Sequence, residues 1–455
     1  MASGPAPSAR RTGFRRPPRA PARPDPSRRT SEFVSKRLRP VRCPIVPITR
    51  TAPSRELIRW RNAVFTIFAL CGFLFASWAS RVPAVRDILG ASTQEMGFLI
   101  LGMSAGSIVG VIAASHIVAR LGATRTILVV YSVVSVGMIA LGPIVTFAPS
   151  FLPIFLVLIT LGGSSIVDVA MNLSGAANER AIGRTIMPLF HAAFSGGTVA
   201  GAGVGALLEA WGVPIGFHFS GVGILSLVVT FVLVRFLQPA EQPLEHGEEP
   251  APGGFLSRLA VWKDPRVLLI GVIVLGMAFA EGSANDWLSL AMVDGHGFDN
   301  AGGAAVLSLF LAAMTAGRIG GVFVLDRFGR VPVLRASAAL AVVGLLMVIF
   351  VPVDALVVVG VVLWGIGASL GFPVGMSAAA DDPRTATATV GAVATIGYTA
   401  FLVGPPLIGL IGQQTGILLA LLVVLVLIAA AGLASGAARP VSTRAVAPEP
   451  AGGAH

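Results

Sequence analysis

The stretch GRIGGVFVLDRFGR, residues 317–330, carries an apolar run into a short polar turn. A related turn occurs earlier, in ARLGATRTILVV at residues 119–130, and in both stretches an arginine stands two residues before a glycine. The two glycines, Gly122 and Gly329, are 207 residues apart, and so are the two arginines. Glycine permits a tight turn, and repeated halves of one chain are typical of transporters. The pattern therefore predicts a duplicated fold.

The composition of the chain is that of a membrane protein. Hydrophobic residues make up 55% of the 455 positions and charged residues only 12%, and the mean hydropathy is +0.83. About a quarter of the residues in a typical soluble domain are charged. The chain therefore has too few charged groups for a water-soluble surface of its size.

Apolar runs of about 20 residues, the length that spans a bilayer as a helix, follow one another along the chain. We expect an all-α integral membrane protein with twelve transmembrane helices. The predicted spans are 62–82, 94–118, 126–145, 148–171, 187–210, 215–236, 267–288, 302–325, 332–352, 355–378, 389–411 and 416–435.

The basic residues predict the orientation of these spans, because cytoplasmic loops are enriched in arginine and lysine. With the N-terminus inside, the cytoplasmic breaks contain twelve basic residues, whereas the opposite side has only Arg81 and Arg86. Both termini are therefore expected in the cytoplasm. A Pro/Glu/Gly-rich segment divides the spans into two pseudo-symmetric bundles of six. The expected organisation is a tail over 1–60, bundles over 61–237 and 267–437, a cytoplasmic linker over 238–266 and a tail over 438–455.

The net charge of +11 belongs to the N-terminal tail. Residues 1–61 hold 16 basic and 3 acidic groups, and most of this segment is rich in Arg and Pro with little to bury. Such a composition favours disorder. A transit peptide, a polybasic lipid-surface segment and an over-extended gene start are alternatives for the tail. The rest of the chain is not basic, so we expect no nucleic-acid partner.

The turn at residues 317–330 resembles the loop motif of the major facilitator superfamily, in which Asp-Arg-x-Gly-Arg joins two helices. Asp326, Arg327, Gly329 and Arg330 match it position by position, whereas Ala119 stands where the first copy should have its aspartate. Other stretches are similar to a bacterial branch that includes fucose permeases, among them DVAMN at 168–172, FHAAFSGG at 190–197 and AEGSANDW at 280–287. The resemblance implies the fold of that superfamily and transport by alternating access.

Enzyme-like strings do not predict an enzyme here. GMSAG at 102–106 fits a hydrolase nucleophile elbow, and GAGVG at 201–205 resembles a dinucleotide loop, but both stand inside apolar helices rather than after a strand. The two cysteines, Cys43 and Cys71, form no ligand cluster. We expect no catalytic residue, no metal and no cofactor.

Two helices carry a glycine at every fourth position, a pattern that lets helices approach closely. Because the resemblance places both helices at the contact between the bundles, it implies that these glycines allow the bundles to rock about a central site. Static packing is the alternative, and it predicts the same glycines. The residues concerned are Gly102, Gly106, Gly110, Gly197, Gly201 and Gly205.

Ionisable residues inside the spans carry the functional predictions, because such groups are expensive in a membrane and are usually functional. Glu281 has no cation near it in sequence, so it is expected to bind protons or solute in the outer half of the seventh span. Asp286 should lie near the outer surface. Arg81, at the end of the first span, is expected to pair with Asp286 or Glu281 as an outer gate, or else to flank the bilayer surface; Arg86 has Asp87 beside it as a partner.

Three further predictions come from the positions of residues along their helices. Arg318 lies two turns before Asp326 on one face, which favours local pairing at the cytoplasmic end. Tyr398 falls in the middle of the eleventh span and is expected to line a solute cavity. Trp78 and Trp287 lie near outer helix ends, where an interfacial aromatic belt is the common explanation.

Asp168 interrupts the fourth span. Counting from residue 150 at 1.5 Å per residue puts it roughly 27 Å into the helix, toward the cytoplasmic side. Ser164 and Asn172 lie four residues before and after it, on the same face. His191 enters the fifth span at a similar depth, so this neighbourhood is expected to hold or pass a proton. A hydrated helix end with an ordinary hydrogen bond is the alternative.

The function predicted is secondary active transport of a small polar, sugar-like solute by proton symport. Efflux by proton antiport, and a non-transporting receptor on the same fold, are the alternatives. The expected partners are the solute, protons and the bilayer of a bacterial inner membrane, with the chain as a monomer. The candidates for proton coupling or solute binding are Glu281, Asp168, His191, Asn172, Asp286 and Tyr398; those for gating are Arg81, Asp326, Arg327, Gly329, Arg330 and Arg318.

Overall fold

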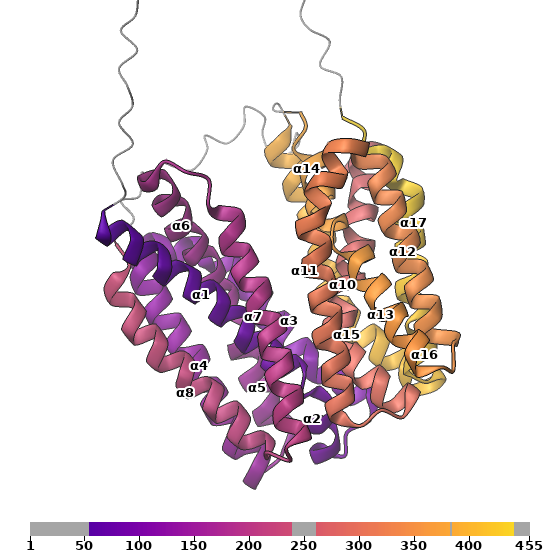
Figure 1. Cartoon of the computed structure of the whole chain (residues 1–455), viewed down its shortest axis with the longest axis horizontal. Coiled ribbons are helices and arrows are strands. Elements are labelled where there is room, and N and C mark those ends of the chain that lie inside the picture. The colour runs from indigo at the N-terminus through magenta and orange to yellow at the C-terminus, as the bar shows by residue number, and fades with distance from the viewer. Residues whose placement is uncertain (1–53, 239–260, 383–384, 441–455) are drawn as a thin grey trace, which may run out of the picture. The chain divides into compact units, whose positions relative to one another are not determined.

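The computed structural model describes residues 54–238, 261–382 and 385–440, all of which belong to one compact unit, Pro53–His455 (Figure 1). Nearly all of the predicted N-terminal tail, most of the linker and most of the C-terminal tail lie outside the described residues. Within them every regular element is a helix.

Residues 54–238, the described part of the first half, form eight α-helices followed by a short 3-10 helix. They are α1 (Arg55–Ala79), α2 (Val82–Leu89), α3 (Thr93–Leu121), α4 (Ala123–Phe147), α5 (Phe151–Gly162), α6 (Ser164–Ile182), α7 (Met187–Ala210), α8 (Ile215–Leu233) and η2 (Val234–Phe236).

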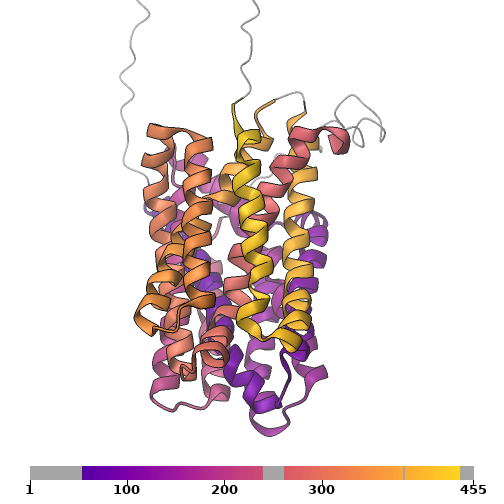
Figure 2. The same cartoon turned by 90° about the vertical axis from the view of Figure 1, so that its right-hand side faces the viewer.

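The second half repeats the succession of long helices, which run side by side in Figure 2. Its elements are η3 (Val261–Lys263), α10 (Pro265–His296), α11 (Asn300–Phe328), α12 (Arg330–Phe350), α13 (Asp354–Ala368), α14 (Gly371–Ala379), α15 (Ala386–Thr415), α16 (Ile417–Ala420), α17 (Leu422–Ala434) and η4 (Ser435–Ala438).

Eleven stretches of the described chain are long and apolar enough to cross a membrane. Three of them consist of two α-helices with a break between them: α5 with α6 and α13 with α14, at similar places in the two halves, and α16 with α17. The prediction of twelve differs at α7, which is 24 residues long but has glycine and alanine where the other spans have larger apolar side chains.

The predicted repeat around the two polar turns is confirmed. Gly122 ends α3 and begins α4 with φ 76°. Gly329 ends α11 and begins α12 with φ 75°. A positive φ of this size favours glycine over residues with a Cβ atom. The same local constraint therefore turns the chain at the same point in each half.

Two spans are longer than predicted, which changes the depth of two carboxylates. The fourth span runs over residues 151–182, so Asp168 lies near its middle and not toward the cytoplasmic end. The seventh, α10, is 32 residues long, so Glu281 lies near its middle rather than in its outer half. Asp286 lies ten residues before the end of α10 at His296, about 15 Å along the axis, and not near the outer surface. Both spans were predicted too short because the helices continue through polar residues beyond the end of the apolar run.

The glycine stripes pack helices within a half and do not face the other half. A Cβ atom on Gly106 would collide with the backbone of Ile159 in α5, and its stripe neighbours Gly102 and Gly110 face α5 and the start of α6. Gly197 and Gly201 lie against the backbone of α1, and Gly205 against Ser80 just beyond it. The six glycines therefore pack helices within the first half, which agrees with the static alternative, and their role in rocking stays a prediction.

Contacts between the halves use other faces of the same helices. α3 packs against α15 and α7 against α11. Gly97 of α3 lies against the backbone of Pro405 and Gly409, and Ser308 of α11 donates a hydrogen bond to the carbonyl oxygen of Val199 at 3.1 Å. The helices named by the resemblance do meet across the halves, but away from their glycine stripes.

Two adjacent glycines of α7 allow a test of this packing. Gly197→Ala should lower the free energy of unfolding by about 1–3 kcal/mol, since the added methyl group has no space against α1. Gly196 is exposed, and nothing lies within 4 Å of the place that an alanine methyl group would take, so Gly196→Ala should change it by less than about 0.5 kcal/mol. Thermal unfolding of the detergent-solubilised chain measures both. Equal midpoints for the two variants would contradict the packing assignment.

Candidate functional site

An ion pair lies near the middle of the membrane-spanning part of the second half. Nη2 of Arg318 in α11 donates to both carboxylate oxygens of Glu281 in α10, at 2.9 and 2.8 Å. Nε of Arg318 donates to the carbonyl oxygen of Ser369, between α13 and α14, at 3.3 Å. The arginine and glutamate side chains are 34% and 20% exposed. The pair is thus anchored by three helices and is still reached by solvent.

This pair corrects two predictions. Arg318 does not pair locally at the cytoplasmic end, and Glu281 does have a cation beside it. The two residues are 37 positions apart, but α10 and α11 are consecutive antiparallel helices. Glu281 lies fifteen residues before the end of α10 and Arg318 eighteen after the start of α11. Counting both residues from the turn between the helices would have placed them at similar depth.

A cavity of about 210 Å³ adjoins the pair, and both halves of the chain line it. Its polar groups are the ion pair, Asn285, Ser195 and Thr198. Its apolar wall is formed by Phe75, Phe194, Leu311 and Met314.

A second group of polar residues lies in the first half. Asn172 donates to the carbonyl oxygen of Asp168 at 2.8 Å and to its carboxylate at 3.2 Å. This contact agrees with the predicted polar face of the fourth span. His191, at the start of α7, interacts electrostatically with Asp168 and, across the halves, with Arg318. Its ring also packs edge-on against Phe68, with 5.3 Å between ring centroids.

Arg81 does not form the predicted gate with Asp286 or Glu281. Its side chain is fully buried within the first half, where it forms an ion pair with Glu209 at the end of α7. It also donates to Nδ1 of His218 at 3.2 Å and to the carbonyl oxygen of Val213 at 2.9 Å. The arginine therefore ties the ends of α1, α7 and α8 together.

Arg86 makes the contact between the halves that the sequence predicts for Arg81. It forms ion pairs with Asp87, as expected, at 2.7 Å and with Asp294 of α10 at 2.6 Å. Asn300 of α11 donates to Asp87 at 3.0 Å. Burial lowers the pKa of Arg86, but the two carboxylates raise it more, so its pKa is above the usual value. Sequence reasoning missed Asp294 because the predicted seventh span ends at residue 288.

Tyr398 lines a different cavity from the ion pair. It contributes to an apolar space of about 280 Å³ between α3 and α15, whose other lining residues include Ser107 and Thr395. The tryptophans predicted for an interfacial belt, Trp78 and Trp287, are fully buried. Helix position alone did not reveal which way these side chains point.

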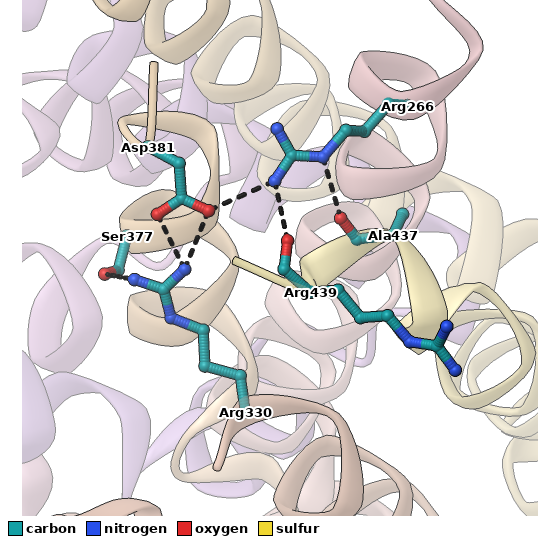
Figure 3. Close-up of polar contacts among 6 residues, drawn as sticks. All are labelled: Arg266, Arg330, Ser377, Asp381, Ala437 and Arg439. Carbon is teal, nitrogen blue, oxygen red and sulfur yellow. Dashed lines mark hydrogen bonds and ion pairs between the residues drawn. The ribbon is translucent and has the colours of Figure 1, made fainter. Parts of the chain in front are cut away.

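At the predicted cytoplasmic end, Asp381 joins two arginines (Figure 3). Nη1 of Arg330 donates to its carboxylate at 2.7 and 2.9 Å, and Arg266 donates to it at 3.1 Å. Arg330 also donates to Ser377 at 2.9 Å, and Arg266 to the carbonyl oxygens of Ala437 and Arg439. This network, here called the Asp381 cluster, connects α10, α12, α14 and η4.

The other charged residues of the polar turn at residues 326–330, Asp326 and Arg327, make fewer polar contacts than Arg330. Asp326 is exposed and makes no ion pair with any described residue. The guanidinium of Arg327 lies 5.7 Å from the ring centre of Phe328. In the part of the chain that the structure describes, no group of three or more His, Cys, Asp or Glu side chains is arranged to hold a metal ion.

The contrast between Asp381 and Asp326 gives a matched test. Asp381→Asn should lower the free energy of unfolding by about 1–3 kcal/mol, because two arginines lose a charged acceptor. Asp326→Asn should change it by less than about 0.5 kcal/mol, as is usual at an exposed position. Thermal unfolding in detergent measures both. A loss of stability in Asp326→Asn as large as in Asp381→Asn would contradict the assigned network.

Relatives of known sequence are bacterial membrane proteins. The chain is 31% identical over 364 residues to the uncharacterized transporter y4wD of Sinorhizobium fredii (strain NBRC 101917 / NGR234), and the match covers 79% of this chain and 92% of y4wD. It is 28% identical over 380 residues to the membrane protein MosC of Rhizobium meliloti, covering 82% and 88% of the two chains.

Several solved structures share the fold. The nucleoside transporter NupG aligns with a TM-score of 0.63 at 14% identity, over 85% of this chain and 98% of NupG. A bacterial homolog of the human lysosomal transporter Spinster, inward-facing and unoccupied, gives 0.66 at 14% identity, over 85% and 98%. A variant of the fucose:proton symporter FucP of E. coli gives 0.53 at 16% identity, over 83% and 99%.

The model of the Major Facilitator Superfamily matches residues 12–187, 184–405 and 287–454. These matches together span most of the chain and both of its halves. With the helical fold and the cavity between the halves, they identify a multi-pass membrane transporter and not an enzyme. The chain belongs to the major facilitator superfamily.

Proposed function

We propose that this transporter takes up a small polar solute together with protons, by alternating access. The observation that carries the proposal is the cavity beside Glu281 and Arg318, because a charged pair at mid-span is usually kept only for function and both halves contribute to the cavity walls. Tilting one half against the other would then open the cavity first to one side and then to the other.

The membrane topology belongs to the same proposal. We take α7 as a twelfth span, since 24 residues rise about 36 Å as a helix and α7 packs along both α1 and α11. Each of the segments 61–237 and 267–437 is then a bundle of six helices. Both termini face the cytoplasm of a bacterial cell, with the chain in the inner membrane.

The size and chemistry of the cavity set limits on the solute. Drug-sized ligands occupy pockets of about 300–1,000 Å³, and this cavity of about 210 Å³ is smaller. Asn285, Ser195 and Thr198 offer hydrogen bonds, while Phe75 and Phe194 offer aromatic surface. A small solute with several polar groups fits this lining.

Proton coupling is assigned to Glu281, Asp168 and His191. His191 interacts electrostatically with both Asp168 and Arg318, and Arg318 pairs with Glu281. These four residues form a series of charged or ionisable groups that crosses from one half to the other. A change of protonation at one member alters the charge balance of the others. Asn172 orients the carboxylate of Asp168. Asp286 and Tyr398 lie outside this series and are secondary candidates.

Gating is assigned to contacts at the predicted outer and cytoplasmic ends of the two helix bundles. At the predicted outer end, Arg86 and Asp294 join the halves. At the predicted cytoplasmic end, the polar turn of Asp326, Arg327, Gly329 and Arg330 is held to α14 through the Asp381 cluster. Arg318 belongs to the central site, and Arg81 to the packing of the first half.

Two alternatives use the same residues differently. Efflux by proton antiport needs the same carboxylates and the same cavity. A receptor would keep the fold but tolerate neutral replacements of Asp168 and Glu281. Symport is preferred because FucP, which shares the fold, is named a fucose:proton symporter.

A solute screen tests the proposal directly. The purified full chain in liposomes, with an imposed inward proton gradient, should accumulate at least one small polar solute. Asp168→Asn and Glu281→Gln should reduce gradient-driven accumulation by about tenfold or more, the size of effect seen for lost proton-transfer groups. Asp354→Asn, at an exposed helix end away from the cavity, is the control.

Three outcomes separate the candidates. Accumulation with full pH dependence in Asp168→Asn would remove Asp168 from coupling. Export of a solute from the liposomes, driven by the inward proton gradient, would favour antiport. If no solute moves and both carboxylates can be replaced without effect on any binding, the receptor interpretation replaces transport.

The outer contact can be tested by chemical accessibility. Arg86→Asp should increase several-fold the labelling of a cysteine at Ser195→Cys by an impermeant maleimide added outside, because residue 86 then repels Asp294. Cys43 and Cys71 are replaced by serine in all variants. Adding Asp294→Arg should restore slow labelling, since it re-forms a pair with reversed charges. Unchanged labelling in Arg86→Asp would show that the pair does not close the outer end.

A further inference from the structure

The guanidinium of Arg318 is only partly used by the protein. Nη2 donates to both oxygens of Glu281, and Nε donates to the Ser369 carbonyl. The described residues offer no acceptor to Nη1, although arginine carries two N–H donors there. The side chain lines the cavity and is 34% exposed. Arg318 therefore keeps two charged donors without a described partner, on a side chain that lines the space assigned to the solute.

The opposite half adds a second side chain with nitrogen donors, the imidazole of His191. His191 of α7 is exposed and interacts electrostatically with Arg318. This interaction is repulsive whenever the imidazole is protonated. An anion seated between α7 and α11 could accept hydrogen bonds from both side chains, and it would bridge the two halves.

Few other ionisable groups face this region. The helices packed on α10 and α11 include α13, α14, α15 and α17, and in these four the only ionisable side chains are Asp354, at the start of α13, and Tyr398. Tyr398 lines the other cavity. Asp286 lies more than one turn beyond Glu281 on α10 and does not line the cavity. The ionisable residues that line the cavity are Glu281 and Arg318. His191 interacts electrostatically with Arg318 and with Asp168.

Charge balance then favours one kind of exchange. In the empty site, Glu281 neutralises Arg318. An anion added alone would leave one uncompensated negative charge, which is costly in a largely apolar cavity. An anion that enters with one proton leaves the net charge at zero, because the proton converts the Glu281 carboxylate to a carboxylic acid and frees Nη2 of Arg318.

We propose that the solute carries a carboxylate, which binds the guanidinium of Arg318 in place of the Glu281 carboxylate when Glu281 is protonated. The fork of N–H groups on arginine matches a carboxylate with two parallel hydrogen bonds. Release reverses the exchange: the solute carboxylate leaves, the proton leaves Glu281, and the ion pair forms again. This inference rests on the proposed function, which makes the cavity the solute site.

The rest of the cavity specifies a hydroxylated acid of small size. The Oδ1 atom of Asn285 is buried and has no hydrogen-bond partner among the described residues, so it can accept from a hydroxyl group. Ser195 and Thr198 lie in the same lining. A small hydroxycarboxylate would satisfy Arg318 and Asn285 together.

Thermal unfolding of the purified full chain tests the exchange without transport, since a ligand that binds the folded state raises the midpoint. The probes are lactate, gluconate and glucuronate, each compared with a neutral counterpart, namely lactamide, sorbitol and glucose, at matched ionic strength. We expect at least one carboxylate to stabilise the protein more than its counterpart. Its affinity should rise by up to about tenfold for each unit of falling pH, because one proton is taken up with it.

Two variants locate the effect. Glu281→Gln should bind the carboxylate with little dependence on pH, since Arg318 is already free. Arg318→Gln should lose the preference for the acid; if this variant does not fold, Arg318→Lys and the pH profile of Glu281→Gln carry the test. Asp354→Asn should behave as the unmodified chain.

The inference is overturned if none of the three carboxylates stabilises either the unmodified chain or Glu281→Gln, or if the neutral counterparts bind equally well. It is also overturned if Glu281→Gln keeps the original pH dependence. Failure of the proposed function looks different: the carboxylate binds as expected, but no uptake follows under a proton gradient. Gradient-driven uptake of a neutral solute alone would support the proposed function and refute this inference.

Discussion

The site depends on one physical constraint, which is that a charge in an apolar interior requires a partner or water. The ion pair of Glu281 and Arg318 meets this constraint. The pair has both, because α10, α11 and the α13–α14 break hold it while the cavity reaches it. Arg81 meets the same requirement differently, through Glu209 and two further acceptors in a fully buried position. One pair is therefore free to exchange partners, and the other fixes helix ends.

Close helix packing within a half allows an exchange of ion-pair partners to be linked to motion between the halves. The glycine stripes of α3 and α7 bring helix backbones together inside the first half, so that half behaves as one packed body. Polar contacts between the halves, such as Arg86 with Asp294, are side-chain contacts that can break and re-form. Motion is therefore expected between packed bodies, and a solute that touches α7 and α11 together would sense their relative position.

The sequence predicted what depends on local chemistry. The positive φ of Gly122 and Gly329, the apolar runs and the contact of Asn172 with Asp168 all follow from residues close together in the chain. It failed where polar residues extend a helix, and so it misplaced the depths of Asp168 and Glu281. It also failed for Arg81 and Arg318, and it missed Asp294 as the second partner of Arg86, because the choice among several acids depends on which helices pack together. Short sequence distance was a poor guide to those partners.

At the predicted cytoplasmic end, acids that lie outside the polar turns are bound by different chemistry in the two halves. In the second half Arg330 binds Asp381, and the motif aspartate Asp326 makes no ion pair among the described residues. In the first half the carboxylate of Glu179 accepts hydrogen bonds from the backbone N–H groups of Ile186 and Met187, both at 2.7 Å, at the start of α7. A carboxylate on free N–H groups of a helix start is stabilising without any arginine. The motif aspartate, Asp326, takes part in neither of these contacts, because Glu179 lies on α6 and Asp381 shortly after α14.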